Sequence, residues 1–510
     1  MKTNRTKNAV RNIVWGVVEK IVSLLLPFVI RTMMIKTIGA EYLGLSSLFT
    51  SILSVLSISE LGIGSAIVFS MYRPIAEDDE DTICALLNVY RKIYHVIGTV
   101  ILVAGTAIVP FLPKLVSGDL PPDVNLYVLY AIFLFSTVIS YYLWAYKAAL
   151  FSAHQRNDLA SKRTITINLI GNVLKIIALA FFKNFYAYII VLPITTIATN
   201  IANAMLAKKV YPTLVCRGDI SQKMKSSMKK RVIGLLSFKI YNVIFSSVDS
   251  IVISAFLGLK MLAIYNNYYY IQTSIIGFLV IITSSITAGI GSKMVTNSVD
   301  DNYADFKKLI FANAWLVSWC SICMAVLYQP FMRLWVGEEL TFSTDTMLLM
   351  VLYFLIPRIT ALTYTYREAA GLWWEDRFRP LVAAAVNLIA NLILVRIIGM
   401  NGVIISTLIC SVGINIPWGS IILFKNYFKR SPAEYFRNII FYVAATALVG
   451  LVTYIICRLV PGEGFIGLIA DGLICVIVPN IGLWLVYHRL DEYKSAVELA
   501  QNMLQKFTKR

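Results

Sequence analysis

The sequence contains few charged residues and very few histidines. Only 15% of its 510 residues are charged, whereas soluble domains carry about 25%. Three histidines, His95, His154 and His488, lie far apart in the chain, which argues against a zinc site or a histidine-based catalytic site. The sequence also lacks the phosphate-binding loop of nucleotide hydrolases, the H-E-x-x-H motif and the G-x-S-x-G motif. We therefore expect a protein that is not an enzyme and that does not use ATP.

Cysteine is also scarce and shows no functional spacing. The seven cysteines form no disulfide or zinc-binding pattern. Cys320 and Cys323 make a C-x-x-C, but it lies within an apolar segment that has no second pair and no nearby histidine. We predict no metal and no cofactor.

The residues that are abundant are apolar. They make up 58% of the chain, and the mean hydropathy is +0.72, so a soluble fold could not bury them all. Apolar runs of roughly 18 to 25 residues indicate membrane-spanning helices. They lie near 10–35, 43–71, 86–112, 126–150, 164–182, 185–207, 232–257, 262–292, 309–328, 346–366, 380–397, 402–424, 438–459 and 464–488. The pattern predicts an all-α integral membrane protein of about 14 transmembrane helices.

The distribution of the positive charge excludes a nucleic-acid-binding protein and predicts the orientation in the membrane. The net charge is +18 and the pI is about 9.4. If the N-terminus is cytoplasmic, most Lys and Arg residues fall in connections on the same side, as the positive-inside rule requires. The largest basic block lies within 208–231, a predicted linker that would also meet anionic headgroups. We expect a multi-pass protein of a bacterial plasma membrane with both termini in the cytoplasm.

An internal repeat predicts two equivalent halves. Residues 168–172, Asn-Leu-Ile-Gly-Asn, recur as Asn-Leu-Ile-Ala-Asn at 387–391, and the same offset carries Ile38-Gly39 onto Leu257-Gly258. Six helices per half make a parallel repeat, which places a substrate path between two lobes. The predicted parts are an N-terminal lobe (1–207), a basic cytoplasmic linker (208–231), a C-terminal lobe (232–424), two further helices (425–488) and a cytoplasmic amphipathic helix (489–510).

Charged residues inside the predicted helices are the candidate functional residues. A charge at the centre of a membrane helix costs about 2.5–3.5 kcal/mol on insertion scales, so it normally faces a cavity or a partner. The deepest cations, which we predict to line a substrate cavity, are Arg31, Lys175, Lys239 and Arg358. Glu60 and Asp249 are predicted either to pair with cations or to couple transport to protons or sodium. Because bases outnumber acids, the cavity suits an anion such as a phosphate or pyrophosphate.

Several segments resemble a known transporter family. They are residues 43–45, 60–66 (Glu-Leu-Gly-Ile-Gly-Ser-Ala), 72–76, 367–373 (Arg-Glu-Ala-Ala-Gly-Leu-Trp), 387–389 and 398–403. These segments are similar to those of the Wzx-type polysaccharide flippases, which export O-antigen, capsule or exopolysaccharide units and belong to the multidrug/oligosaccharidyl-lipid/polysaccharide exporter superfamily. The likeness covers nearly the whole chain.

The resemblance implies a V-shaped transporter whose two lobes alternate between inward-open and outward-open states. The implied substrate is an undecaprenyl-pyrophosphate-linked oligosaccharide, carried from the inner to the outer leaflet. The implied partners are membrane lipids and other polysaccharide assembly proteins. The resemblance gives Arg31, Lys239 and Arg358 substrate contacts, and it singles out Glu60 because this residue stands in the matching Glu-Leu-Gly element.

Three other interpretations compete with the flippase. A multidrug or cation antiporter of the same fold would have a cavity richer in acids than in bases. A membrane glycan polymerase or ligase would carry a long outer loop, and the predicted outer connections are short. A purely structural membrane protein leaves the charges inside the helices unexplained.

Overall fold

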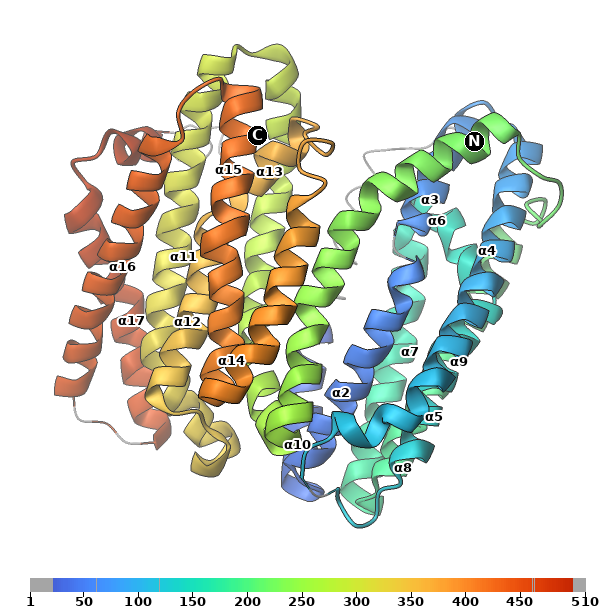
Figure 1. Ribbon diagram of the computed structural model, residues 1–510, viewed down its shortest axis with the longest axis horizontal. Helices are drawn as coiled ribbons and strands as arrows, with labels where there is room; N and C mark the ends of the chain where they lie inside the picture. The colour runs from blue at the N-terminus through green and yellow to red at the C-terminus, as the bar shows by residue number, and fades with distance from the viewer. Residues whose placement is uncertain (1–21, 61, 119, 461, 463, 499–510) are drawn as a thin grey trace. The chain divides into compact units, whose positions relative to one another are not determined.

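The structure is a computed structural model, and it describes residues 22–60, 62–118, 120–460, 462 and 464–498. Every regular element within these ranges is a helix (Figure 1). A helix satisfies its own backbone hydrogen bonds, which the hydrocarbon core of a membrane requires. Nine helical runs in the described part are long and apolar enough to cross a membrane, or up to ten if one bent pair counts as a span. The prediction of an all-α integral membrane protein is confirmed, and the number fourteen stays a prediction.

The chain divides into two compact units, Met1–Ala263 and Ile264–Arg510. In chain order the first unit contains a helix at 22–37, α2 (Ala40–Leu56), η1 (Ser57–Glu60), α3 (Ile63–Ala76), α4 (Glu80–Ile108), η2 (Val109–Leu115), α5 (Leu126–Tyr142), η3 (Ala145–Lys147), α6 (Ala148–Ala153), α7 (Asn157–Ile177), η4 (Ala178–Phe182), α8 (Phe185–Ile189), α9 (Val191–Val210) and the first part of α10 (Gln222–Thr296).

Small residues and aromatic rings pack the helices of the first unit. Helix α4 contacts α3 and α5, and α9 contacts α5 and α7. Gly105 of α4 leaves room for Leu134 of α5, and its carbonyl accepts a 3.0 Å hydrogen bond from the Tyr130 hydroxyl. Close approach at a small residue, together with an interhelical hydrogen bond, is the usual way for membrane helices to associate.

The second unit contains the rest of α10 and the elements that follow it. These are α11 (Val299–Val336), η5 (Glu338–Leu340), α12 (Thr344–Ile359), α13 (Ala361–Ala369), α14 (Arg379–Cys410), η6 (Ser411–Asn415), α15 (Ile416–Leu423), η7 (Phe424–Phe428), α16 (Ala433–Leu459) and α17 (Gly464–Tyr487). Helix α11 contacts α12, α16 and α17. The indole of Trp315 on α11 donates to Asn480 of α17 at 2.9 Å, and Thr446 of α16 donates to Ser318 of α11 at 2.6 Å. The last two helices are therefore attached to α11 by polar contacts as well as by packing.

Two helix breaks have the backbone conformation expected of a repeat. Gly39, between helix 22–37 and α2, has φ 122° and ψ 162°, and Gly258, within α10, has φ 86° and ψ 173°. These are the two glycines that the internal repeat aligns. Leu259 follows the second break and lies against Gly44, where a methyl group would come within 2.3 Å of the Leu259 carbonyl oxygen. The likeness supports the repeat, while the predicted lobe boundaries stay a prediction.

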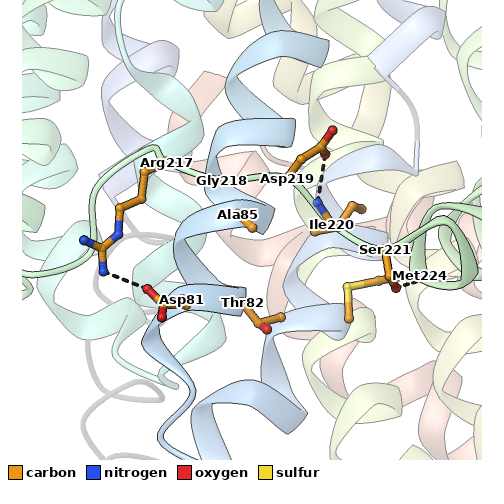
Figure 2. A pocket seen from close by; sticks show the side chains of 9 residues that line it. All are labelled: Asp81, Thr82, Ala85, Arg217, Gly218, Asp219, Ile220, Ser221 and Met224. Carbon is orange, nitrogen blue, oxygen red and sulfur yellow. Dashed lines mark hydrogen bonds and ion pairs between the residues drawn. The ribbon is translucent and has the colours of Figure 1, made fainter.

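The first part of the predicted linker lies on the first unit. The ring of Tyr211 stacks on His154 with centroids 4.3 Å apart, and Asn88 donates to the Gly218 carbonyl at 2.7 Å. Arg217 pairs with Asp81 at 2.7 Å (Figure 2). These contacts leave a polar pocket of about 390 Å³ between α4 and residues 217–224. Residues 211–221, which we call the docked segment, are therefore bound by α4 and the α6–α7 connection.

The predicted C-terminal amphipathic helix is described only at its start. Residues 491–498 are helical, and Tyr493 packs on Phe311 and Trp315 of α11 with ring centroids 6.3 and 5.9 Å away. The remainder of the predicted helix, 499–510, lies outside the described residues.

Candidate functional site

Glu60 lies at an interruption between two helices of the first unit. Helix α2 ends at Leu56, the short helix η1 follows, and α3 begins after Gly62, whose φ is 93°. A left-handed residue at this point suits glycine, which has no Cβ to clash. The interruption places the Glu60 carboxylate between α4 and α5 rather than along a continuous helix face.

Two tyrosines donate hydrogen bonds to this carboxylate. The Tyr94 hydroxyl of α4 donates to Oε1 at 2.6 Å, and the Tyr141 hydroxyl of α5 donates to Oε2 at 2.5 Å. Tyr90, one turn before Tyr94, donates to the Tyr94 hydroxyl at 2.8 Å. Short O–H···O⁻ bonds of this kind are roughly twice as strong as neutral ones. Among the described residues, the hydrogen bonds to Glu60 thus come from phenols and not from an intramembrane cation.

Glu60 also lines a cavity of about 440 Å³ in the first unit, together with apolar side chains such as those of Leu53, Phe133 and Leu192. Small hydroxyl side chains from α2, η1, α5 and α9 surround it. They are Thr50, Ser54, Ser57, Ser136, Thr137, Ser140 and Thr196. A carboxylate together with many hydroxyl oxygens is an oxygen-rich environment that suits a proton or a hard cation. Glu60 is the acidic side chain among the residues that line this cavity. In the described part of the chain, no group of three or more His, Cys, Asp or Glu side chains is placed to hold a metal ion.

A second constellation joins two of the predicted cations. Lys175 of α7 places its Nζ 5.5 Å from the ring centroid of Tyr188 in α8. Arg31 lies close enough to Tyr188 to interact electrostatically with its hydroxyl. Both cations are half-buried. A guanidinium and an ammonium group near one phenol offer N–H donors that suit phosphate oxygens.

The remaining predicted site residues lie elsewhere. Lys239 is half-buried in α10, and Asp249, 10 positions along the same helix, is 2% exposed. Arg358 is half-buried near the end of α12 in the second unit, where its carbonyl accepts a 3.0 Å hydrogen bond from Asn313. The structure brings together Arg31 and Lys175; the roles of all six residues in transport stay predictions.

Sequence reasoning missed the tyrosines around Glu60 and the hydroxyl lining of the cavity. Ser136 and Ser140 lie one helical turn apart in one segment. In another segment, Thr50, Ser54 and Ser57 are spaced four and three residues apart. Such a stripe places the hydroxyl groups on one helix face. A search for polar stripes of this kind would have found the lining, whereas the choice of Tyr94 and Tyr141 as donors depends on how α4 and α5 pack.

The aligned asparagines of the repeat have different environments. Asn387 and Asn391 of α14 are fully buried, and they hydrogen-bond to Thr407 and Ser406 at 3.1 and 2.7 Å. Asn168, the counterpart of Asn387, is exposed. The repeated asparagine is therefore part of a buried polar network at Asn387 in α14, whereas Asn168 at the equivalent position of α7 is not buried.

A family model named polysaccharide biosynthesis protein matches residues 9–287. The chain belongs to this family. The match extends over more than half of the chain and includes Glu60, Arg31, Lys175, Lys239 and Asp249. No curated protein matches the sequence.

Solved structures of transporters share the fold of this polysaccharide biosynthesis protein. The lipid II flippase MurJ in an inward closed conformation is 16% identical, with a TM-score of 0.64 over 94% of this chain and 98% of MurJ. An inward-facing multidrug resistance transporter of the MATE family is 12% identical, with a TM-score of 0.61 over 84% of this chain and 100% of the transporter. A transporter of the same superfamily from Pyrococcus furiosus is 14% identical, with a TM-score of 0.53 over 83% of this chain and 97% of its own. The predicted resemblance to this superfamily is confirmed by the shared fold, and the chain is a membrane protein of the polysaccharide biosynthesis family.

Proposed function

We propose that the chain is a flippase that moves an undecaprenyl-pyrophosphate-linked oligosaccharide from the inner to the outer leaflet by alternating access. The observation that carries the proposal is the pair of half-buried cations, Arg31 and Lys175, around Tyr188. A charged side chain inside a membrane normally faces a partner or a water-filled cavity, and guanidinium and ammonium groups suit the phosphates of a pyrophosphate. Membership of the polysaccharide biosynthesis family supports an oligosaccharide as the rest of the substrate.

In this proposal the predicted residues have different roles. Arg31, Lys175, Lys239 and Arg358 bind the pyrophosphate at successive stages of transport. The protein forms no covalent bond with its substrate, so it acts as a transporter and not as an enzyme. It works in a bacterial plasma membrane with both termini in the cytoplasm, beside other polysaccharide assembly proteins.

A coupling role for Glu60 is the second part of the proposal. An ionised carboxylate accepts hydrogen bonds from both Tyr94 and Tyr141, whereas a protonated one must use one oxygen as a donor. Binding of a proton or a cation therefore changes the contacts that join η1 to α4 and α5. The same cavity would serve a multidrug or cation antiporter, which is the alternative function that Glu60 favours.

Mass spectrometry of lipids from cells depleted of the protein tests the proposal. We expect lipid-pyrophosphate-linked oligosaccharide to accumulate and surface glycan to fall, because the glycan is built but not delivered. Unchanged surface glycan without accumulation would contradict the flippase and leave the antiporter as the better hypothesis.

Variants of the cationic pair test the site within the same assay. Lys175→Ala is expected to reduce transport about ten-fold, since a hydrogen bond to a charged group contributes about 1.5–3 kcal/mol. Lys183→Ala is the matched control, because Lys183 is exposed just after the same helical run. Equal transport by both variants at equal membrane levels would remove Lys175 from the site.

A further inference from the structure

The connection between α13 and α14, residues 370–378, is held by buried charges. The Asp376 side chain is fully buried, and its two oxygens lie 2.6 Å from Nε of Arg379 and 2.9 Å from Nε of Arg367. Both arginine side chains are also almost completely buried. Removing one partner of such a cluster leaves an uncompensated buried charge, which is strongly destabilising. The connection is thus attached to the ends of both helices that it joins.

The same arginines attach the connection to a third part of the second unit. Nη1 of Arg379 donates to the Asn415 side chain of η6 at 2.5 Å. The guanidinium of Arg367 packs on Gly419 of α15, where a Cβ would lie 2.1 Å from Nη1. With these contacts, the connection has a fixed conformation and is not a loose surface loop.

The exposed face of this connection carries a cation between two aromatic rings. The Arg377 guanidinium lies 3.9 Å from the ring centroid of Trp374 and 4.5 Å from that of Phe378. Its Nη1 also donates to the Trp374 carbonyl at 2.5 Å. Trp374 is 72% exposed and Phe378 is 55% exposed. We call these three residues the aromatic–arginine surface.

This surface lies where two candidate membrane spans meet the water. One span ends at Ala369 and another begins at Arg379. Tyr366, just before this connection, packs on Phe306 of α11 and Phe428 of η7. The same end of the second unit therefore also carries the Arg430–Asp300 ion pair and the start of α16. Tryptophan and arginine are both typical of the boundary between hydrocarbon and headgroups.

We propose that the aromatic–arginine surface binds the phosphate of a bilayer phospholipid at this boundary, with Trp374 and Phe378 inserted among the headgroups. Stacking fixes the plane of the guanidinium, whose remaining N–H groups suit phosphate oxygens. Glu375 is exposed beside Trp374, so the surface carries one positive and one negative charge. The single guanidinium matches the single negative charge of a lipid phosphodiester. The site anchors this end of the second unit to the leaflet, independently of what the protein transports.

Photo-crosslinking of the full chain in phospholipid nanodiscs tests the proposal. The lipid carries a photo-activatable group next to its phosphate, and mass spectrometry measures labelling of residues 370–379. We expect labelling in the wild type and a loss of about five-fold in Trp374→Ala/Arg377→Ala, which corresponds to ~1 kcal/mol for an exposed cation–π contact and a phosphate contact. Wild-type labelling no higher than that of an exposed water-facing segment would overturn the proposal, whether or not the variant folds.

The matched control is a second arginine–aromatic contact at the end of α16, whose start lies on the same side of the second unit as the aromatic–arginine surface. Arg458 stacks on Tyr454 with 5.2 Å to the ring centroid and bonds its hydroxyl at 3.0 Å. Arg458→Ala should leave the labelling of residues 370–379 unchanged, and a matching loss there would show a general disturbance and contradict a local site.

Soluble pyrophosphate distinguishes the two sources of phosphate. We expect millimolar pyrophosphate to leave the labelling unchanged; displacement would assign the site to the substrate and overturn a phospholipid site. A variant that loses labelling but still transports leaves the proposed flippase function intact, so the two proposals can fail separately.

Discussion

Glu60, the first residue of the Glu-Leu-Gly element, lines the cavity of the first unit and accepts hydrogen bonds from two phenol hydroxyls. Glutamine has nearly the same shape but cannot ionise, so Glu60→Gln keeps the packing and removes the chargeable group. We expect Glu60→Gln to fold normally, to transport about ten-fold more slowly and to lose the dependence of the transport rate on pH or sodium. Flipping assays in proteoliposomes with imposed proton or sodium gradients measure this.

Glu77 offers a control for Glu60, since it forms only an exposed pair with Arg73 at 2.8 Å. Glu77→Gln should transport at the wild-type rate. An ion dependence that persists in Glu60→Gln would move the coupling site elsewhere, with buried Asp249 as the next candidate.

Gly44 of α2 lies against the backbone of Leu259, just after the helix break at Gly258. A methyl group there would lie 2.3 Å from the Leu259 carbonyl oxygen, so the backbone must move to accept it. We expect Gly44→Ala to destabilise the protein by about 1–3 kcal/mol, the usual range for overpacking. The unfolding midpoint in detergent measures this effect. Gly413→Ala is the control because nothing lies within 4 Å of a Cβ at that position, and equal midpoints would contradict the close contact.

At the scale of elements, we expect the binding of the docked segment to depend on pH. Burial lowers the pKa of His154, so the folded state favours the neutral imidazole that stacks on Tyr211. The stabilisation is present above the ordinary histidine value of about 6.5 and declines as the pH falls through it. Hydrogen exchange of residues 211–221 should therefore become faster between about pH 7.5 and 5.5, after correction for intrinsic rates. His154→Phe keeps a ring for Tyr211 and should remove this dependence.

A second titration in the docked segment lies at lower pH. The hydrogen bond from Lys225, followed by that from the Ile220 N–H, lowers the pKa of Asp219. Its contribution is present above the ordinary value of about 3.9 and is lost as the pH falls through the lowered folded-state pKa. We expect Asp219→Asn to speed exchange of residues 217–221 at neutral pH, whereas exchange at the connection near Glu338 in the second unit should not change. Identical exchange of residues 217–221 in the wild type and in Asp219→Asn would show that Asp219 does not stabilise the docked segment.

At the scale of the whole molecule, the proposed coupling role of Glu60 leads to a prediction about the source of energy. We expect flipping in proteoliposomes to proceed without ATP and to slow when an ionophore removes the proton or sodium gradient, because Glu60 is the proposed coupling acid. An ATP requirement would contradict this mechanism. Unaltered flipping with every gradient removed would restrict the protein to downhill transport driven by use of the product.

The membrane character and the helical class could be predicted because they depend on composition and local order. A run such as 380–397 must become a helix in hydrocarbon, since no other open structure satisfies its backbone hydrogen bonds. The breaks at Gly39 and Gly258 were also visible, because a repeated glycine marks a conformation that other residues adopt at a cost. Candidate charges such as Glu60 and Lys175 stood out for the same local reason, the cost of placing them in a membrane.

The tertiary structure decided which of these residues meet. Arg31 and Lys175 are far apart in sequence, and α8 places Tyr188 near both. Glu60 has tyrosine partners because α4 and α5 pack on either side of η1. Arg367, near the end of α13, is buried against Asp376 and Gly419, which follow it in the connection and in α15. The sequence by itself thus determined that this is a helical membrane protein with costly internal charges, because transfer free energy acts on each segment separately. The partners of those charges depend on packing between distant helices, which no local pattern encodes.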